Sequence, residues 1–505
     1  MKHILVLALL ALTSFSFSQK LRFKVTGQQD TTVYLVRYYG KGLYYADTAQ
    51  MKNGNVEFNG AKQKPGILAL LLPGQKYFEF IYNNEEINLE TSKTDLVNAM
   101  KVKKSEENTV FITYIQYINS QRTKANELTT KREALKKDDP QYKVLGDQID
   151  AIAKEVTAYQ NNIVATHPKN MVSKIVKMSM DVKVPEAPKK ADGSPIDSNF
   201  AYHYYRDHYF DNIDLKDDRL VNTPLFHNKL EYFFGKNMLI QHPDTIVKYA
   251  YWFCDQLDPK SELFKYCVTY ITSTFEKSNI MGMDKVFVRM GQRYYCPKNA
   301  EGKSAAFWMA EDKLKDLCEK VETHKNLVQG VVPPNIALRD TTDVIWKDFY
   351  SLKSEYTILY FWDPECGHCK KTTPKLQKLY AEKLKARNVE VFGVGKAIGE
   401  DFGKWKKFIR DNNLSYINVG LTDKLYKAAT EDARQFVPKY TTLQALNYQD
   451  TYDIYTTPRI FVLDKDKKIV AKGLSISQLE DLMDRLQGVK NAPILFPPDP
   501  EDEAH

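Results

Sequence analysis

The stretch ILYFWDPECGHC, residues 358–369, determines the fold of the C-terminal part of this chain. Its first half is apolar, aromatic and short, which is typical of a buried strand in a parallel or mixed sheet. Its second half ends in two cysteines, Cys366 and Cys369, and leucines at helical spacing follow. We therefore expect a strand that delivers Cys366 to the start of a helix, with the two sulfur atoms close together as a redox dithiol.

The two cysteines have different predicted roles. Backbone N–H groups and the helix dipole favour an anion at a helix N-terminus, so the predicted nucleophile is the Cys366 thiolate. Cys369, one turn later, is suited to attack the mixed disulfide and release the reduced substrate. An imidazolium on His368 would stabilise the Cys366 thiolate. This would raise the reduction potential of the Cys366–Cys369 couple and bring it nearer to about −180 mV than to about −270 mV. Glu365 opposes this effect if it is ionised and close.

Two prolines strengthen the prediction of a redox site. Pro374 falls inside the predicted active-site helix, where a proline would kink it. Pro458, preceded by Thr457, begins a later β-rich run, as a cis-proline loop requires. On these motifs, residues 331–487 resemble a thioredoxin-fold domain of the TlpA/ResA type. The resemblance implies that Thr457 and Pro458 pack against the dithiol and that the Thr457 backbone pairs with the substrate.

The sequence departs from the thioredoxin pattern in two places. Thioredoxins usually carry a buried Asp six residues before the nucleophile as a proton acceptor, and Tyr360 stands at that position here. Position 360 therefore provides no carboxylate for a proton relay. The Gly-His pair between the cysteines resembles protein disulfide isomerases more than thioredoxin. The direction of electron flow stays open.

Other interpretations of the cysteine pair are weaker. A zinc site needs a second pair of ligands, and the remaining cysteines stand singly, at positions 254, 267, 296 and 318. A peroxiredoxin would carry Thr three residues before its cysteine, where this chain has Asp363. His203 and His208 are five residues apart and do not share a helix face, which disfavours a metal site. The sequence implies no cofactor.

The four single cysteines can form disulfides if the chain is exported. Cys254 and Cys267 flank a predicted turn between two helices and are one candidate pair. The preferred prediction is that these cysteines are buried free thiols, which behave as small apolar residues.

Residues 1–18 are typical of a secretory signal peptide: Lys2 and His3 precede a short apolar core, and small residues precede Gln19. We expect cleavage before Gln19 and a location in the periplasm or cell envelope. The expected partners are disulfide-containing exported proteins, with a membrane electron donor if the protein runs as a reductase. The net charge of +8 is spread along the chain without a basic stripe, so nucleic acid is not an expected partner.

The rest of the chain is predicted from its periodicity. Residues 20–95 alternate between apolar and polar positions, which indicates a small β-sandwich. Residues 105–165 have the spacing of an antiparallel helical hairpin, and residues 199–326 are mainly helical. In pattern and position these parts resemble the segments that precede a thioredoxin module in Gram-negative envelope proteins. The predicted domains are a signal peptide (1–18), a β-sandwich (19–98), a helical hairpin (99–182), a mainly α domain (183–326), a thioredoxin-like domain of α/β fold (327–488) and a disordered tail (489–505).

Two functional hypotheses follow. The first is a periplasmic thiol:disulfide oxidoreductase that reduces or exchanges disulfides, in which an insertion at residues 428–448 shapes substrate choice. The second is an envelope binding module, in which residues 19–326 recognise a partner and the dithiol senses or locks the complex.

Overall fold

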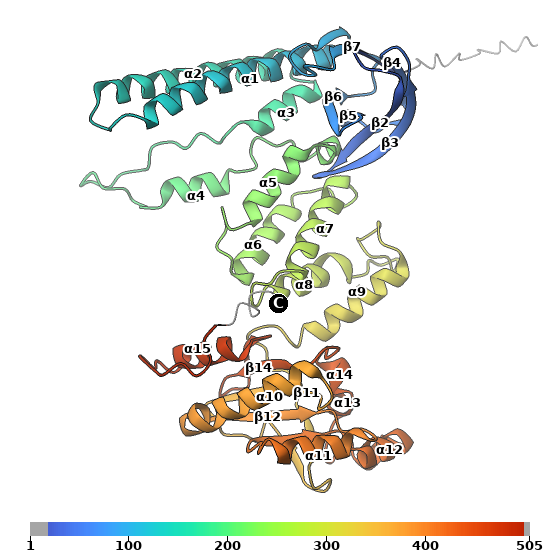
Figure 1. Ribbon diagram of the computed structural model, residues 1–505, viewed down its shortest axis with the longest axis vertical. Coiled ribbons are helices and arrows are strands. Elements are labelled where there is room, and N and C mark those ends of the chain that lie inside the picture. Colours follow the sequence, from blue (N-terminus) through green and yellow to red (C-terminus); the bar gives the residue numbers. More distant parts are fainter. Residues whose placement is uncertain (1–18, 499–505) are drawn as a thin grey trace, which may run out of the picture. The chain divides into compact units, whose positions relative to one another are not determined.

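The computed structural model describes residues 19–498, which divide into two compact units (Figure 1). The first unit contains residues 19–239 and 255–267, and the second contains residues 240–254 and 268–498. The predicted signal peptide and the last seven residues, 499–505, lie outside the described residues.

The first unit contains a β-sandwich of two four-stranded sheets, with strand orders β4-β1-β7-β8 and β3-β2-β5-β6. Alternate residues point into its core, as Leu21, Phe23 and Val25 do. Five of its strands are β2 (Thr31–Tyr39), β4 (Asn55–Asn59), β5 (Gly66–Leu72), β6 (Lys76–Tyr82) and β7 (Ile87–Ser92). Three further strands are present, β1 (Lys20–Thr26), β3 (Gly42–Met51) and β8 (Lys101–Lys104).

The predicted helical hairpin is formed by α1 (Glu106–Glu133) and α2 (Pro140–Thr166), which lie side by side (Figure 1). Side chains at its base, including Phe111 and Ile163, belong to the same hydrophobic cluster as the sandwich. Between residues 122 and 160, all within the described chain, no side chain is buried. The base of the hairpin therefore completes the sandwich core, and its far end is exposed to solvent.

The middle of the chain is mainly helical, as predicted. Its helices are α3 (Met171–Ser179), α4 (Phe200–Asp207), α5 (Pro224–Phe234), α6 (Pro243–Cys254), α7 (Glu262–Glu276), α8 (Asp284–Met290) and α9 (Glu311–His324).

The prediction of free thiols is wrong for two of the four single cysteines. Cys296 and Cys318, the latter on α9, form a disulfide with a Cα–Cα distance of 5.6 Å. Cys254 and Cys267 are both buried and do not form the candidate disulfide. Sequence spacing cannot tell which helices bring two cysteines within the 4.4–6.8 Å range that a disulfide requires.

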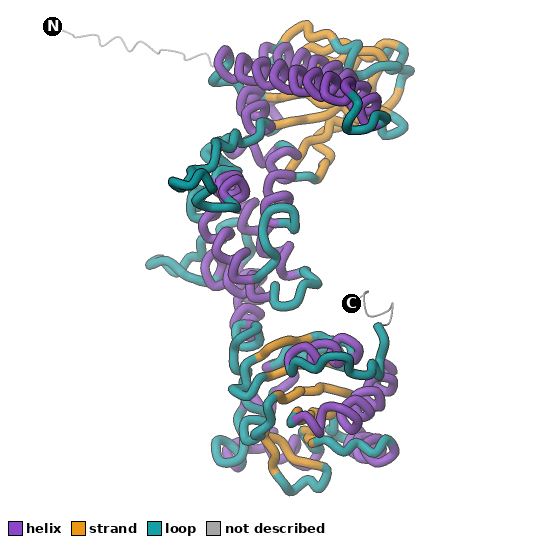
Figure 2. Tube along the Cα trace, turned by 90° about the vertical axis from the view of Figure 1, so that its left-hand side faces the viewer, coloured by secondary structure: helices purple, strands orange, loops and turns teal. Residues whose placement is uncertain are grey.

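The second unit contains a seven-stranded sheet with the order β10-β9-β13-β12-β11-β14-β15 (Figure 2). Strand β11 (Tyr356–Trp362), an interior strand, pairs in parallel with β12 (Val389–Gly395) and antiparallel with β14 (Arg459–Leu463). Burial on both faces explains the almost continuous apolar run of β11. The remaining strands are β9 (Ala337–Asp340), β10 (Trp346–Asp348), β13 (Ile417–Gly420) and β15 (Ile469–Lys472).

Successive residues of β11 belong to two different hydrophobic clusters. Tyr360 and Trp362 lie in one cluster, and Leu359 and Phe361 lie in the other. The first cluster includes side chains of α10 (Gly367–Leu379), α11 (Asp401–Asp411) and α15 (Ile476–Leu486). The second includes side chains of α12 (Asp423–Asp432), α13 (Leu443–Leu446) and α14 (Tyr448–Thr451). Of these helices, α13 lies within residues 428–448, the predicted insertion, and α12 and α14 overlap its ends.

The start of the predicted disordered tail is anchored to this unit. The backbone N–H groups of Leu495 and Phe496 both donate to the carboxylate of Glu480, at 2.9 Å each. Glu480 is buried on α15 and also accepts from Lys383. The abundance of proline and acidic residues in the tail predicts disorder, but the apolar pair at 495–496 packs against the core up to the last described residues.

We expect the Cys296–Cys318 disulfide to stabilise its segment measurably. The cross-linked residues are 22 positions apart, and closing a loop of that length in the unfolded chain corresponds to about 3 kcal/mol. The double variant Cys296→Ala/Cys318→Ala should therefore lose about that much unfolding free energy in urea under non-reducing conditions. An unchanged urea midpoint would show that the disulfide does not stabilise the fold.

Candidate active site

A short turn between β11 and α10 positions Cys366. The carboxylate of Asp363 accepts the backbone N–H of Glu365 at 2.8 Å, and the Asp363 carbonyl accepts the N–H of Cys366 at 3.2 Å. Cys366 is the N-cap residue of α10, with extended backbone angles, and its side chain is half-buried. Cys369, one turn into the helix, is fully buried. The predicted order of strand, dithiol and helix is observed.

The two thiols have opposite pKa shifts. Partial burial of Cys366 favours its neutral form, but hydrogen bonds with the backbone of Cys369 and with Thr457 outweigh burial and lower its pKa. Burial raises the pKa of Cys369 to about 12, although the backbone N–H of Asp363 donates to its sulfur at 3.5 Å. At neutral pH the half-buried Cys366 thiol is therefore more readily ionised than the buried Cys369 thiol, which is protonated.

The segment before β14 closes the site on its other side. The Thr457–Pro458 peptide bond is cis, and the Cys366 thiol donates to the Thr457 carbonyl at 3.2 Å. These residues are 91 positions apart in the sequence. The structure thus brings Cys366, Cys369, Thr457 and Pro458 into one site.

His368 and Glu365 flank the dithiol without contacting its sulfur atoms through their side chains. His368 is exposed, and its backbone N–H is one of the groups that lower the pKa of Cys366. The Glu365 carboxylate lies 3.2 Å from Lys404 and 3.7 Å from Lys370, and the hydrogen bond from Lys404 lowers its pKa. Because these ammonium groups offset its charge, the predicted opposition of Glu365 to the thiolate is weakened.

Tyr360 stands where thioredoxins usually carry a buried Asp, and its hydroxyl forms a pair with the hydroxyl of Thr373. The hydroxyls of Tyr360 and Thr373 lie 2.7 Å apart, both fully buried, and either can be the donor. Burial raises the pKa of Tyr360, which keeps its hydroxyl neutral. Thr373 was not singled out by the sequence, although it lies four residues after Cys369 and so shares its helix face.

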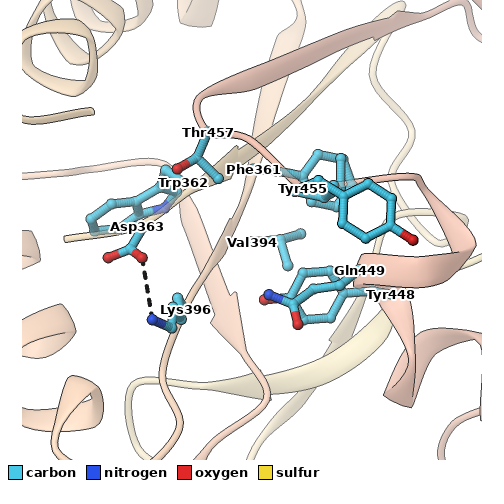
Figure 3. A pocket seen from close by; sticks show the side chains of 10 residues that line it. Phe361, Trp362, Asp363, Val394, Lys396, Tyr448, Gln449, Tyr455 and Thr457 are labelled. Atoms are coloured by element: carbon cyan, nitrogen blue, oxygen red, sulfur yellow. Dashed lines mark ion pairs between the residues drawn. The ribbon is translucent and has the colours of Figure 1, made fainter. Parts of the chain in front are cut away.

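A cavity of about 230 Å³ lies next to the dithiol loop (Figure 3). Its walls come from the ends of β11 and β12, from α14 and from the segment before Pro458. The sequence predicted an insertion near the cis-proline but did not identify the residues that line this space.

Within residues 19–498, no group of three or more His, Cys, Asp and Glu side chains could hold a metal ion. No helix in the same range has the length and apolar character that a membrane crossing requires.

Two segments of the chain match known families. Residues 20–111 match a domain of unknown function, DUF4369, and residues 354–469 match a family described as thioredoxin-like. No curated protein matches the sequence.

Several solved structures are similar to this chain. A domain of a possible thiol-disulfide isomerase from Cytophaga hutchinsonii is 31% identical, with 32% of this chain and 94% of that chain covered and a TM-score of 0.25. The thioredoxin domain of a thiol-disulfide oxidoreductase from Bacteroides vulgatus is 25% identical, with coverage of 32% and 97% and a TM-score of 0.25. A thioredoxin-like protein from Bacteroides caccae is 15% identical, with coverage of 60% and 98% and a TM-score of 0.40. At these TM-scores, the structural likenesses add no weight to the geometry of the site.

We expect Cys366 to be the first cysteine alkylated in the reduced protein. Its thiolate fraction rises with pH through a lowered pKa, so the half-maximal rate with iodoacetamide should fall below about pH 8.5, the value of an ordinary thiol. Cys369, buried and with a pKa raised to about 12, should stay unmodified under the same conditions. Mass spectrometry of the alkylated peptides gives both profiles.

The variant His368→Ala separates the imidazole from the backbone contacts. If the imidazolium stabilises the thiolate, the profile of Cys366 shifts to higher pH. An identical profile would assign the lowered pKa to the backbone alone.

Proposed function

Because the C-terminal domain belongs to the thioredoxin-like family of thiol:disulfide oxidoreductases, we propose that this chain reduces or exchanges disulfides in exported proteins through Cys366 and Cys369. The observation that carries the proposal is the placement of the two sulfur atoms: Cys366 is half-buried at the N-cap of α10 and contacts the Thr457 carbonyl at 3.2 Å, and Cys369 is fully buried one turn later. The lowered pKa of Cys366 and the raised pKa of Cys369 agree with this placement. A nucleophile must be ionised before it meets its substrate, and a resolving thiol must not compete with it. The two sulfur environments satisfy both requirements.

The proposed reaction proceeds in two displacements. The Cys366 thiolate attacks one sulfur of the substrate disulfide; that bond breaks, a mixed disulfide forms, and the released substrate thiolate takes up a proton. Cys369 then loses its proton and attacks the Cys366 sulfur, which forms the Cys366–Cys369 disulfide and releases the second substrate thiolate. Two electrons pass from the dithiol to the substrate, and a dithiol donor must return them before the next cycle.

The neighbouring groups have distinct proposed roles. Thr457, whose carbonyl faces the Cys366 sulfur at 3.2 Å, aligns the substrate backbone beside the reacting atom. Pro458 has no N–H and therefore leaves no competing donor at this position. The Tyr360 and Thr373 hydroxyls stay neutral and act as a hydrogen-bonding pair, so the proton of Cys369 leaves by another path, through solvent or the departing substrate thiolate.

We further propose that the protein works in the periplasm or cell envelope. The signal-like pattern of residues 1–18 supports this location. The Cys296–Cys318 disulfide also supports it, because such bonds persist in oxidising compartments and are rare in the cytosol.

Substitution of the two cysteines should have different consequences in an insulin-disulfide reduction assay with dithiothreitol as donor. Cys366→Ser removes the nucleophile and should reduce the rate to that of dithiothreitol alone. Cys369→Ser should leave the first displacement intact. When this variant is reduced, freed of dithiothreitol and then mixed with insulin, it should accumulate a mixed disulfide that is visible on a non-reducing gel. Cys254→Ala, which removes a buried thiol elsewhere, is the matched control and should keep the wild-type rate. Reduction by Cys366→Ser at the wild-type rate would exclude the mechanism.

Fractionation of expressing Gram-negative cells tests the location. We expect the full-length gene product to be recovered from the periplasmic or envelope fraction with Gln19 as its first residue. Recovery from the cytoplasm with Met1 retained would contradict the proposed export.

A further inference from the structure

The cavity beside the dithiol has the position of a ligand site in an open α/β sheet. It is bounded by Phe361 to Asp363 at the carboxyl end of β11, and by Val394 and Lys396 at the carboxyl end of β12. These two strands are parallel neighbours. Ligands of such sheets bind outside the carboxyl ends of the strands, where the loops diverge.

Two lining residues connect the cavity directly to the reacting sulfur atoms. Thr457 lines the cavity, and its carbonyl accepts the Cys366 thiol at 3.2 Å. Asp363 also lines it, and its backbone N–H contacts the Cys369 sulfur at 3.5 Å. A substrate chain whose disulfide reaches Cys366 therefore has a neighbouring side chain within reach of this space.

The walls of the cavity differ in character (Figure 3). The rings of Phe361, Tyr448 and Tyr455 form one side. The ion pair between Asp363 and Lys396, with 3.4 Å between its charged atoms, lies on the opposite side. The Trp362 ring also lies on the side of the ion pair (Figure 3). The first side thus offers aromatic contact surface, and the second offers charged hydrogen-bonding groups beside one further ring.

A polar amide faces this space from α14. Gln449 on α14 is exposed, and its side chain points from the aromatic side toward Lys396 (Figure 3). Tyr455 is 78% exposed, with its hydroxyl directed away from the cavity and its ring turned toward it. Both residues present polar or aromatic surface that the packing of the core does not require.

The charges around the cavity offset one another. Lys396 lies 3.4 Å from Asp363 and 3.1 Å from Asp401, and Lys404 lies 3.8 Å from Asp401. Lys404 also lies 3.2 Å from Glu365, which lies 3.7 Å from Lys370, so three carboxylates are matched by three ammonium groups. Because a charged occupant would meet both signs at close range, a neutral occupant with an apolar body and a polar end fits this site best.

We propose that this cavity is a specificity subsite for an aromatic side chain, preferably tyrosine, next to the target cysteine of the substrate. Its volume of about 230 Å³ lies below the roughly 300–1,000 Å³ of sites that enclose small-molecule ligands, and suits a single side chain. The ring packs against the aromatic wall, and the phenol hydroxyl reaches Asp363 or Gln449. This inference rests on the proposed oxidoreductase function and adds to it the class of substrate that is selected.

The test uses synthetic peptides that each contain one intramolecular disulfide and differ only in the residue beside one cysteine. Tyr, Phe, Ala and Lys are placed there, on the N-terminal side in one series and on the C-terminal side in another. For one of the series we expect wild-type kcat/KM to be about tenfold higher with Tyr than with Ala, with Phe between them and Lys no better than Ala. Equal values for all four residues in both series, or a preference for Lys, would overturn the proposal.

Substitutions in the cavity wall test whether the preference for Tyr over Ala arises at this cavity. Gln449→Ala and Tyr455→Ala should each lower the Tyr-to-Ala ratio of kcat/KM toward one, and the use of two variants guards against a local distortion by either. Tyr426→Ala removes a tyrosine that is 43% exposed on α12 and does not line the cavity, so it should keep the wild-type ratio. A ratio that survives both wall variants would overturn the subsite. Failure of the wild-type protein to reduce any peptide would instead overturn the proposed function.

Discussion

The structure of the site depends on the free backbone N–H groups at the start of α10. They favour a negative charge on the half-buried sulfur of Cys366, which without them would be more stable as a neutral thiol. This stabilisation requires that β11 end at Trp362 and that the Asp363 turn hold Cys366 in the N-cap position. The buried core under β11 therefore determines the reactivity of an atom at its edge.

The parts of the fold with strong local signals could be predicted from the sequence. Strand β11 and the helix after the dithiol are specified by a short, uninterrupted apolar run and by helical leucine spacing, and both are observed. Strands β9 and β13, four residues each, were not predicted. Segments of that length carry too few alternations to be recognised, and they become strands because a neighbouring strand pairs with them.

The residues of the candidate site whose side chains have characteristic chemistry could be predicted from the sequence. The residues that belong to the site because distant segments contact one another could not. The cysteines and the Thr457-Pro458 pair are recognisable in the sequence, although only the fold shows that Cys366 and Thr457 are in contact. The bond between Tyr360 and Thr373, and the linkage of Cys296 to Cys318, depend on how distant segments pack. Neither residue type nor spacing determines such partners.

The side chains of β11 point alternately to the two faces of its sheet, and the two faces contact different helices. Tyr360 and Trp362 pack in the cluster that contains α10, and Leu359 and Phe361 pack in the cluster that contains α12 to α14. Phe361 and Trp362, at the end of the strand, both line the cavity. Because successive strand residues point to opposite faces, Tyr360 supports the dithiol helix without facing α12 to α14. A substitution in α14 can therefore change the cavity wall while the side chains beneath α10 that hold the two thiols stay the same.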